Sequence, residues 1–152
     1  MIAGVPAPVA PVAPAARVSV LVADDNALYR DGVVRALTRR SLDVVAEVGD
    51  GVQAIEAIRR LRPRVALLDL RMPHLDGIDV AEQVRADPTL GGVRVLILSA
   101  EDRRAAVQRA EAAGVVGYLD KDVTRRDICD AVIAAAAADA PHDGAGAPLV
   151  TA

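Results

Sequence analysis

Residues 65–69 read VALLD and residues 93–98 read VRVLIL, and these two short runs decide the fold of this 152-residue chain. The first follows Pro63 and the second follows Gly91-Gly92, so each begins just after a turn or a helix end. Mostly apolar runs of this length are typical of strands that are buried on both faces of a parallel sheet. The two runs therefore predict a sheet covered by helices on both sides.

The same alternation of strand and helix extends outward over residues 17–138. The predicted strands are Val18–Ala23, Val44–Val48, Val65–Asp69, Val93–Leu98 and Val115–Leu119. Helices are predicted over about 26–39, from about Gly51 to Pro63, over 75–86 and 101–113, and up to Ala138. Five such repeats predict an α/β protein with a five-stranded, doubly wound parallel sheet.

The two ends of the chain have a different composition. Residues 1–16 carry four prolines and predict a disordered arm, and residues 139–152 predict a flexible tail or a truncated linker. The start lacks the basic residues of a secretory signal, and no run of eighteen apolar residues predicts a membrane span. We expect a cytoplasmic protein that does not contact a membrane.

Composition excludes several classes of function. The chain has no Trp, no Phe and two Tyr, so it lacks the aromatic platform on which single-stranded nucleic acid stacks. The net charge of −3 gives no overall attraction to nucleic acid, and we expect no direct nucleic-acid binding. Cys129 is the single cysteine, which excludes an internal disulfide and predicts a packing residue.

Polar residues follow four of the predicted strands. Asp24 and Asp25 follow the first strand, Asp69 ends the third, Ser99 follows the fourth, and Lys121 lies just beyond the fifth. In a doubly wound parallel sheet the carboxyl ends of the strands share one edge, where ligands bind. We therefore expect three carboxylates, a hydroxyl and an amine to meet there.

These residue types together favour phosphoryl transfer. Clustered carboxylates require a compensating cation, and Mg²⁺ prefers carboxylate and phosphate oxygens. An aspartate such as Asp69 can act as a nucleophile and become an aspartyl phosphate. Lys121 is the only lysine beside 17 arginines, which indicates a specific need for a compact positive charge near the phosphoryl oxygens.

Four motifs carry a resemblance to a known family. DD at 24–25, LLDLRMPHLDG at 67–77, LSA at 98–100 and GYLDKD at 117–122 resemble the receiver domains of response regulators in two-component signalling, and the match spans residues 17–138. The resemblance implies the CheY-like, flavodoxin-like fold with strand order 2-1-3-4-5. The GYLDKD region and the helix after it look like receivers of the NarL/FixJ class.

The resemblance implies a role for each matching residue at the acidic site. It makes Asp69 the phosphoacceptor and Asp24 and Asp25 the acidic pair. The Mg²⁺ ligands would be these acids, with Asp25 in direct contact, and the backbone carbonyl of Arg71. Lys121 would contact the phosphoryl group.

The resemblance also implies a switch and a donor. Ser99 takes the position of the hydroxyl residue that turns toward the phosphoryl group, and Tyr118 that of the aromatic residue that swings inward. Their movement would remodel the face formed by the fourth helix, the fifth strand and the fifth helix. The implied donor is a histidine kinase or a phosphotransfer protein, and no separate substrate, and hence no conventional enzyme, is expected.

Other readings of the sequence remain open. A Mg²⁺-dependent phosphatase also uses an Asp nucleophile, but Asp69-Leu70-Arg71 lacks the second acid of the DxD pattern typical of those enzymes. An interaction module that is never phosphorylated is a further alternative. The output partner, homodimerisation, and the choice between a stand-alone receiver and a piece of a longer regulator are not decided by the sequence.

Overall fold

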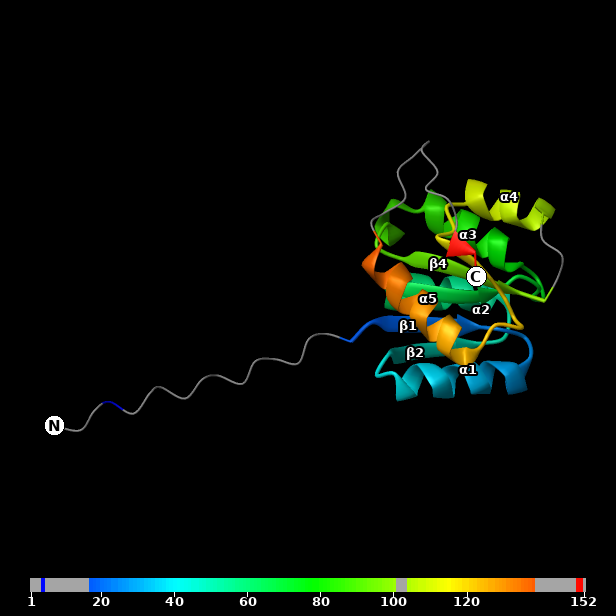
Figure 1. Cartoon of the computed structure of the whole chain (residues 1–152). Helices are drawn as coiled ribbons and strands as arrows, with labels where there is room; N and C mark the ends of the chain where they lie inside the picture. Colours follow the sequence, from blue (N-terminus) through cyan, green and yellow to red (C-terminus); the bar gives the residue numbers. More distant parts are fainter. Residues whose placement is uncertain (1–3, 5–16, 101–103, 139–149, 152) are drawn as a thin grey trace.

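The structure is a computed structural model that describes residues 4, 17–100, 104–138 and 150–151. The strands are β1 (Ser19–Ala23), β2 (Asp43–Val48), β3 (Val65–Asp69), β4 (Arg94–Ser99), β5 (Gly117–Asp120) and β6 (Val150–Thr151). The helices are α1 (Ala27–Arg39), α2 (Gly51–Leu61), α3 (Gly77–Ala86), α4 (Arg104–Ala112) and α5 (Arg125–Ala137), with a short 3-10 turn, η1 (Pro88–Leu90), before β4. Figure 1 shows the sheet between two layers of helices.

The strands form one parallel sheet in the order β2-β1-β3-β4-β5-β6. The predicted parallel sheet and its order 2-1-3-4-5 are confirmed. The structure adds β6, two residues that pair with β5 so that Val150 lies opposite Gly117. β6 falls within the predicted tail, whose residues 139–149 and 152 lie outside the described part, as do nearly all of the predicted arm and residues 101–103 of the fourth predicted helix.

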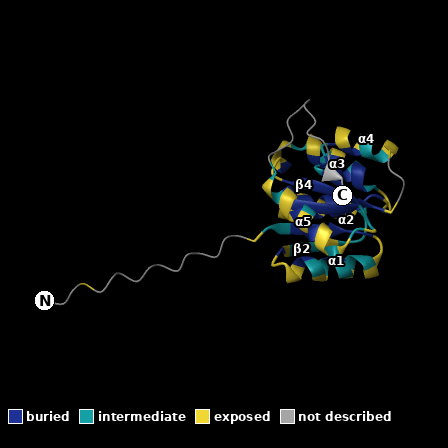
Figure 2. Ribbon diagram, in the orientation of Figure 1, coloured by how far each residue is buried: buried dark blue, intermediate teal, exposed yellow. Residues whose placement is uncertain are grey.

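Side chains of the central strands alternate between two apolar clusters, one on each face of the sheet. Leu21 of β1 packs toward α2, α3 and α4, whereas Val20 and Val22 pack toward α1 and α5. All residues of β3 and β4 are buried, as the dark centre of Figure 2 shows. Burial on both faces explains why the sequence of these two strands is mostly apolar and does not alternate.

Polar caps start α1, α2, α3 and α5, and they lie on the edge of the sheet where the strands have their carboxyl ends. Asn26 caps α1 by accepting a hydrogen bond from the Tyr29 N–H, and Asp50 and Thr124 cap α2 and α5 in the same way. Asp76 caps α3 in a reciprocal box with Asp79. Each cap satisfies backbone N–H groups that the helix itself leaves unpaired. The loops at this edge therefore have defined geometry.

The opposite edge of the sheet is held by arginine side chains. Arg64, just before β3, donates hydrogen bonds to the carbonyl oxygens of Ala136 (2.8 Å) and Ala138 (3.3 Å) at the end of α5 and of Gly92 (3.0 Å). Arg94 of β4 also donates to Ala138, at 3.1 Å.

Among the described helices, none is long and apolar enough to cross a membrane.

Candidate functional site

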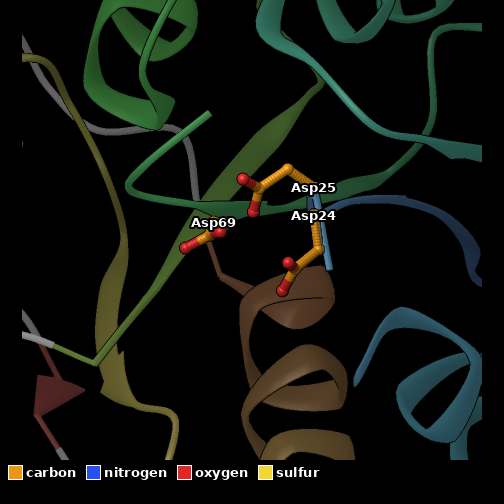
Figure 3. Close-up of side chains that lie close together, drawn as sticks. All are labelled: Asp24, Asp25 and Asp69. Carbon is orange, nitrogen blue, oxygen red and sulfur yellow. The ribbon is translucent and has the colours of Figure 1, made fainter. Parts of the chain in front are cut away.

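Three carboxylates meet where β1 and β3 end. Asp24 and Asp25 directly follow β1, and Asp69 is the last residue of its neighbour β3. The register of the two strands, in which Ala23 lies opposite Leu68, places Asp24 beside Asp69. One oxygen from each acid lies within 4.8 Å of the others, and Figure 3 shows the three side chains close together. The structure therefore brings the three acids together, as the sequence predicts.

The three acids differ in exposure. Asp24 and Asp69 are buried, with 2% and 6% of their surface exposed, whereas Asp25 is exposed. The Asn26 N–H donates to Asp24 Oδ1 at 2.9 Å, and the Arg71 N–H lies 3.4 Å from Asp69 Oδ1. Two buried acids beside an exposed one form a site that is enclosed on the protein side and open toward solvent.

Lys121 reaches this site from the loop after β5. Its Nζ lies 2.8 Å from Asp24 Oδ2 and 3.3 Å from Asp69 Oδ2, and the side chain is 17% exposed. The Lys121 N–H donates to the carbonyl oxygen of Ser99 at 3.0 Å, which fixes the loop against the end of β4. The only lysine of the chain therefore lies between the two buried acids.

The surroundings of Asp69 favour its neutral form. Burial and the neighbouring Asp24 charge raise its pKa to about 7, although the Lys121 ammonium acts in the opposite direction. Burial opposes the charged form of Lys121, but the hydrogen bond to Asp24 and the charges of both acids outweigh burial and raise the Lys121 pKa. Lys121 is therefore protonated at neutral pH, and the acids still carry excess negative charge.

The donor set fits a hard divalent cation. Three carboxylate oxygens within 4.8 Å, one acid facing solvent and a single compensating ammonium leave a negative site that such an ion would neutralise. Arg71 lies in the loop after β3, where its backbone is beside Asp69. The cluster of acids is thus compatible with Mg²⁺.

The two predicted switch residues lie on the neighbouring strands. Ser99 ends β4, one strand away from Asp69, and is 1% exposed. Tyr118 of β5 is completely buried among the residues that pack toward α2, α3 and α4. The structure therefore buries the Tyr118 side chain and places Ser99 at the same edge as the acids.

The loop after β3 is held close to Asp69 by glycine. A Cβ at Gly77, the first residue of α3, would lie 2.5 Å from the Asp69 carbonyl oxygen and 3.0 Å from Ile97 Cδ1. His74 in this loop has a φ of 71°, in the left-handed region that turn residues adopt. Only a residue without a side chain lets the start of α3 come this close to the phosphoacceptor candidate.

Two features of the site were missed by sequence reasoning. An open pocket of about 610 Å³ lies beside the acids, and its lining includes Asp25, Met72 and Arg109. The ring of Tyr29, on α1, lies against Lys121, with the ring centroid 4.6 Å from Nζ. No motif or spacing indicates either feature, because each joins segments that are far apart in the chain.

The chain belongs to the response regulator receiver family, whose sequence profile matches residues 20–133. It is therefore the receiver domain of a two-component response regulator. It is similar to the probable transcriptional regulatory protein NarL of Mycobacterium tuberculosis, with 48% identity over 120 residues that cover 77% of this chain and 54% of the relative. It is also similar to the response regulator protein VraR of Staphylococcus aureus, with 35% identity over 116 residues covering 76% and 54%.

A solved structure agrees with this assignment. The signal receiver domain of the putative response regulator NarL from M. tuberculosis superposes with a TM-score of 0.75 at 47% identity, covering 79% of this chain and 96% of that one. The chain spans about half the length of the curated relatives it matches. The similarity thus concerns their receiver portion.

Proposed function

We propose that this receiver accepts a phosphoryl group on Asp69 from a histidine kinase or a phosphotransfer protein, with Mg²⁺ as cofactor. The observation that carries the proposal is the buried Asp69 carboxylate, which lies beside Asp24 and Asp25 and is paired with the Lys121 ammonium. Membership of the receiver family supports the same function.

The three acids would bind the metal, and one of them, Asp69, would also be the nucleophile. Asp24, Asp25 and Asp69, with the backbone carbonyl of Arg71, would bind Mg²⁺, which supplies positive charge to the carboxylates and to the phosphoryl oxygens. An Asp69 oxygen attacks the phosphorus of a phosphohistidine. A P–O bond forms, the P–N bond breaks, and its electron pair returns to the imidazole nitrogen. The product is an aspartyl phosphate.

Lys121 and Ser99 would stabilise the transferred group. When Asp69 becomes an acyl phosphate, its carboxylate charge moves outward onto the phosphoryl oxygens. The Lys121 ammonium, 3.3 Å from Asp69 Oδ2, then needs only a small displacement to pair with those oxygens. The Ser99 hydroxyl, at the end of the adjacent strand, would donate a hydrogen bond to the same group and couple it to the inward position of Tyr118.

The output would be a change on the face formed by α4, β5 and α5. Tyr118 lies in β5, so a movement of its ring would change this face directly, and Ser99 ends the neighbouring strand β4. The relatives are named as transcriptional regulators and are about twice as long as the matched segment. We propose that this receiver, located in the cytoplasm, controls either a partner protein or an output domain through that face.

Intact-mass measurement tests the proposal. The purified chain is incubated with acetyl phosphate with and without Mg²⁺, and Asp69→Asn is compared with the wild type. The matched control is Asp43→Asn, which changes an exposed aspartate at the start of β2. We expect one phosphoryl adduct, dependent on Mg²⁺, in the wild type and in Asp43→Asn and none in Asp69→Asn.

Other outcomes would overturn the assignment. An adduct that persists in Asp69→Asn would place the acceptor elsewhere. Absence of an adduct from all three proteins, with the fold intact by circular dichroism, would indicate a receiver that signals by binding alone. Continuous release of phosphate from a small phosphoester would support a phosphatase.

A further inference from the structure

Tyr29 forms a contact between the candidate site and two helices. It is the third residue of α1, and its N–H donates to the Asn26 side chain at 3.0 Å, so its backbone is fixed beside the acidic loop. Its ring centroid lies 4.6 Å from Lys121 Nζ and 4.4 Å from the guanidinium carbon of Arg125. One aromatic ring therefore contacts two cations, one of them at the site.

The ring and the two acids together determine where the Lys121 ammonium lies. Asp24 and Asp69 attract Nζ by charge at 2.8 and 3.3 Å, and the ring attracts it through its quadrupole. A lysine side chain has four rotatable bonds, and the ammonium has water as an alternative partner. The ring covers part of the ammonium, whose side chain remains only 17% exposed, and so opposes its escape toward water.

The hydroxyl of Tyr29 does not explain this arrangement. Among the described residues the buried Tyr29 oxygen has no hydrogen-bond partner. A buried hydroxyl without a partner costs free energy and contributes nothing to the position of Lys121. The aromatic face is therefore the functional part of this side chain.

Arg125 holds the same ring from the first turn of α5. Its guanidinium also packs over Gly32 of α1, where an added Cβ would lie 3.2 Å from Arg125 Nη2. The small residue at position 32 leaves room for the arginine to reach the ring. The contact thus joins α1, the loop after β5 and the start of α5 around Lys121.

We propose that Tyr29 is a positioning residue for Lys121, and that its ring holds the ammonium at Asp24 and Asp69 and thereby sets the rate at which Asp69 is phosphorylated. The position of Lys121 can be tested without phosphorylation. The effect on rate rests on the proposed function of Asp69.

Nuclear magnetic resonance of the side chain tests the position directly. Because Lys121 is the only lysine, labelling with ¹³C,¹⁵N-lysine gives a single set of side-chain signals. The ε-methylene protons should show an upfield ring-current shift in the wild type. The shift should persist in Tyr29→Phe, which keeps the ring, and disappear in Tyr29→Leu, which removes it. Leu28→Ala, an adjacent and 84% exposed position on α1, is the matched control and should keep the shift.

Phosphorylation by acetyl phosphate at saturating Mg²⁺ gives the second readout. We expect the rate for Tyr29→Leu to fall about threefold to thirtyfold, the range that corresponds to the loss of a partly desolvated cation–π contact. Tyr29→Phe should rescue the rate, as the conservative variant that keeps the ring. Tyr29→Met serves as a second variant without a ring if Tyr29→Leu does not fold.

The two readouts separate the possible failures. Lysine signals that are unchanged in Tyr29→Leu would overturn the positioning role. Signals that move while the phosphorylation rate stays the same would overturn its effect on the reaction. A wild-type protein that is not phosphorylated would refute the proposed function of Asp69 and with it the rate effect, and the lysine signals would still decide the position.

Discussion

Asp69 has a pKa of about 7 because burial and the charge of Asp24 both favour its neutral form. Lys121 reduces this effect but does not abolish it. A carboxyl that is ionised at pH 7 when the chain is unfolded is therefore partly protonated in the folded, metal-free protein. At this residue, the arrangement that suits cation binding works against stability in the absence of the cation.

The stability of the metal-free protein should fall as pH rises from about 4 to about 7. In this window the folded state binds more protons at Asp69 than the unfolded state, so the free energy of unfolding decreases with rising pH. Thermal unfolding in the presence of EDTA measures it. Asp69→Asn should raise the melting temperature more at pH 8 than at pH 5. An equal effect at both values would contradict the raised pKa.

Mg²⁺ affinity should rise with pH until Asp69 is ionised. Binding requires the carboxylate form, so below pH 7 the apparent affinity should increase by up to about tenfold per pH unit. Calorimetric titration at several pH values from about 5.5 to about 8, on both sides of the Asp69 pKa, measures this dependence. The slope should be smaller in Asp69→Asn. A wild-type affinity that does not change with pH would show that Asp69 does not titrate in this range.

At the scale of elements, the start of α3 is packed directly against the end of β3. The close approach of Gly77 to the Asp69 carbonyl oxygen and to Ile97 leaves no room for a methyl group. This packing and the capping box of Asp76 with Asp79 together position the loop between the strand and the helix. A change at Gly77 should therefore affect both stability and the site.

Gly77→Ala should lower the free energy of unfolding by about 1–3 kcal/mol, the usual cost of overpacking. It should also slow phosphorylation, because α3 can accommodate the methyl group only by moving away from Asp69. Urea unfolding and intact mass measure the two effects. Gly92→Ala is the matched control, since a Cβ there would meet no atom within 4 Å. Equal unfolding midpoints for the two variants would refute the packing argument.

Elements defined by local pattern were predictable, and those defined by contact were not. β3 begins and ends at the predicted residues because it is a bounded apolar run. Asp24, Asp69 and Lys121 could be brought together because parallel strands end at a common edge. The η1 turn and the pairing of β6 with β5 depend on tertiary context. The contact of Tyr29 with Lys121 also depends on tertiary context, because it joins residues 92 positions apart in the chain.

At the scale of the whole molecule, the carboxyl ends and the amino ends of the strands carry different kinds of residue. One edge carries the acids, and the other carries Arg64, which joins the loop before β3 to the end of α5 and to Gly92. Carbonyl groups at a helix C-terminus attract cations, so this arginine is favourably placed. The hydrogen bonds of Arg64 at this edge therefore stabilise the packing of α5 against the sheet.

Arg64→Met should therefore destabilise the domain without altering phosphorylation. The methionine keeps much of the apolar stem but loses the hydrogen bonds to Ala136 and Ala138, and a loss of about 1–3 kcal/mol is expected. Urea unfolding measures it. Arg60→Met, on the exposed surface of α2, is the control and should change stability little. A phosphorylation rate that fell in Arg64→Met would show that the two edges are coupled.

The placement of the two tyrosines makes the molecule its own optical reporter. Without Trp or Phe, all aromatic emission comes from Tyr29 beside Lys121 and Tyr118 inside the core. Both rings lie next to groups that the proposed switch would move. A change in tyrosine fluorescence on phosphorylation can therefore be read without any label, and Tyr29→Phe divides it between the two rings.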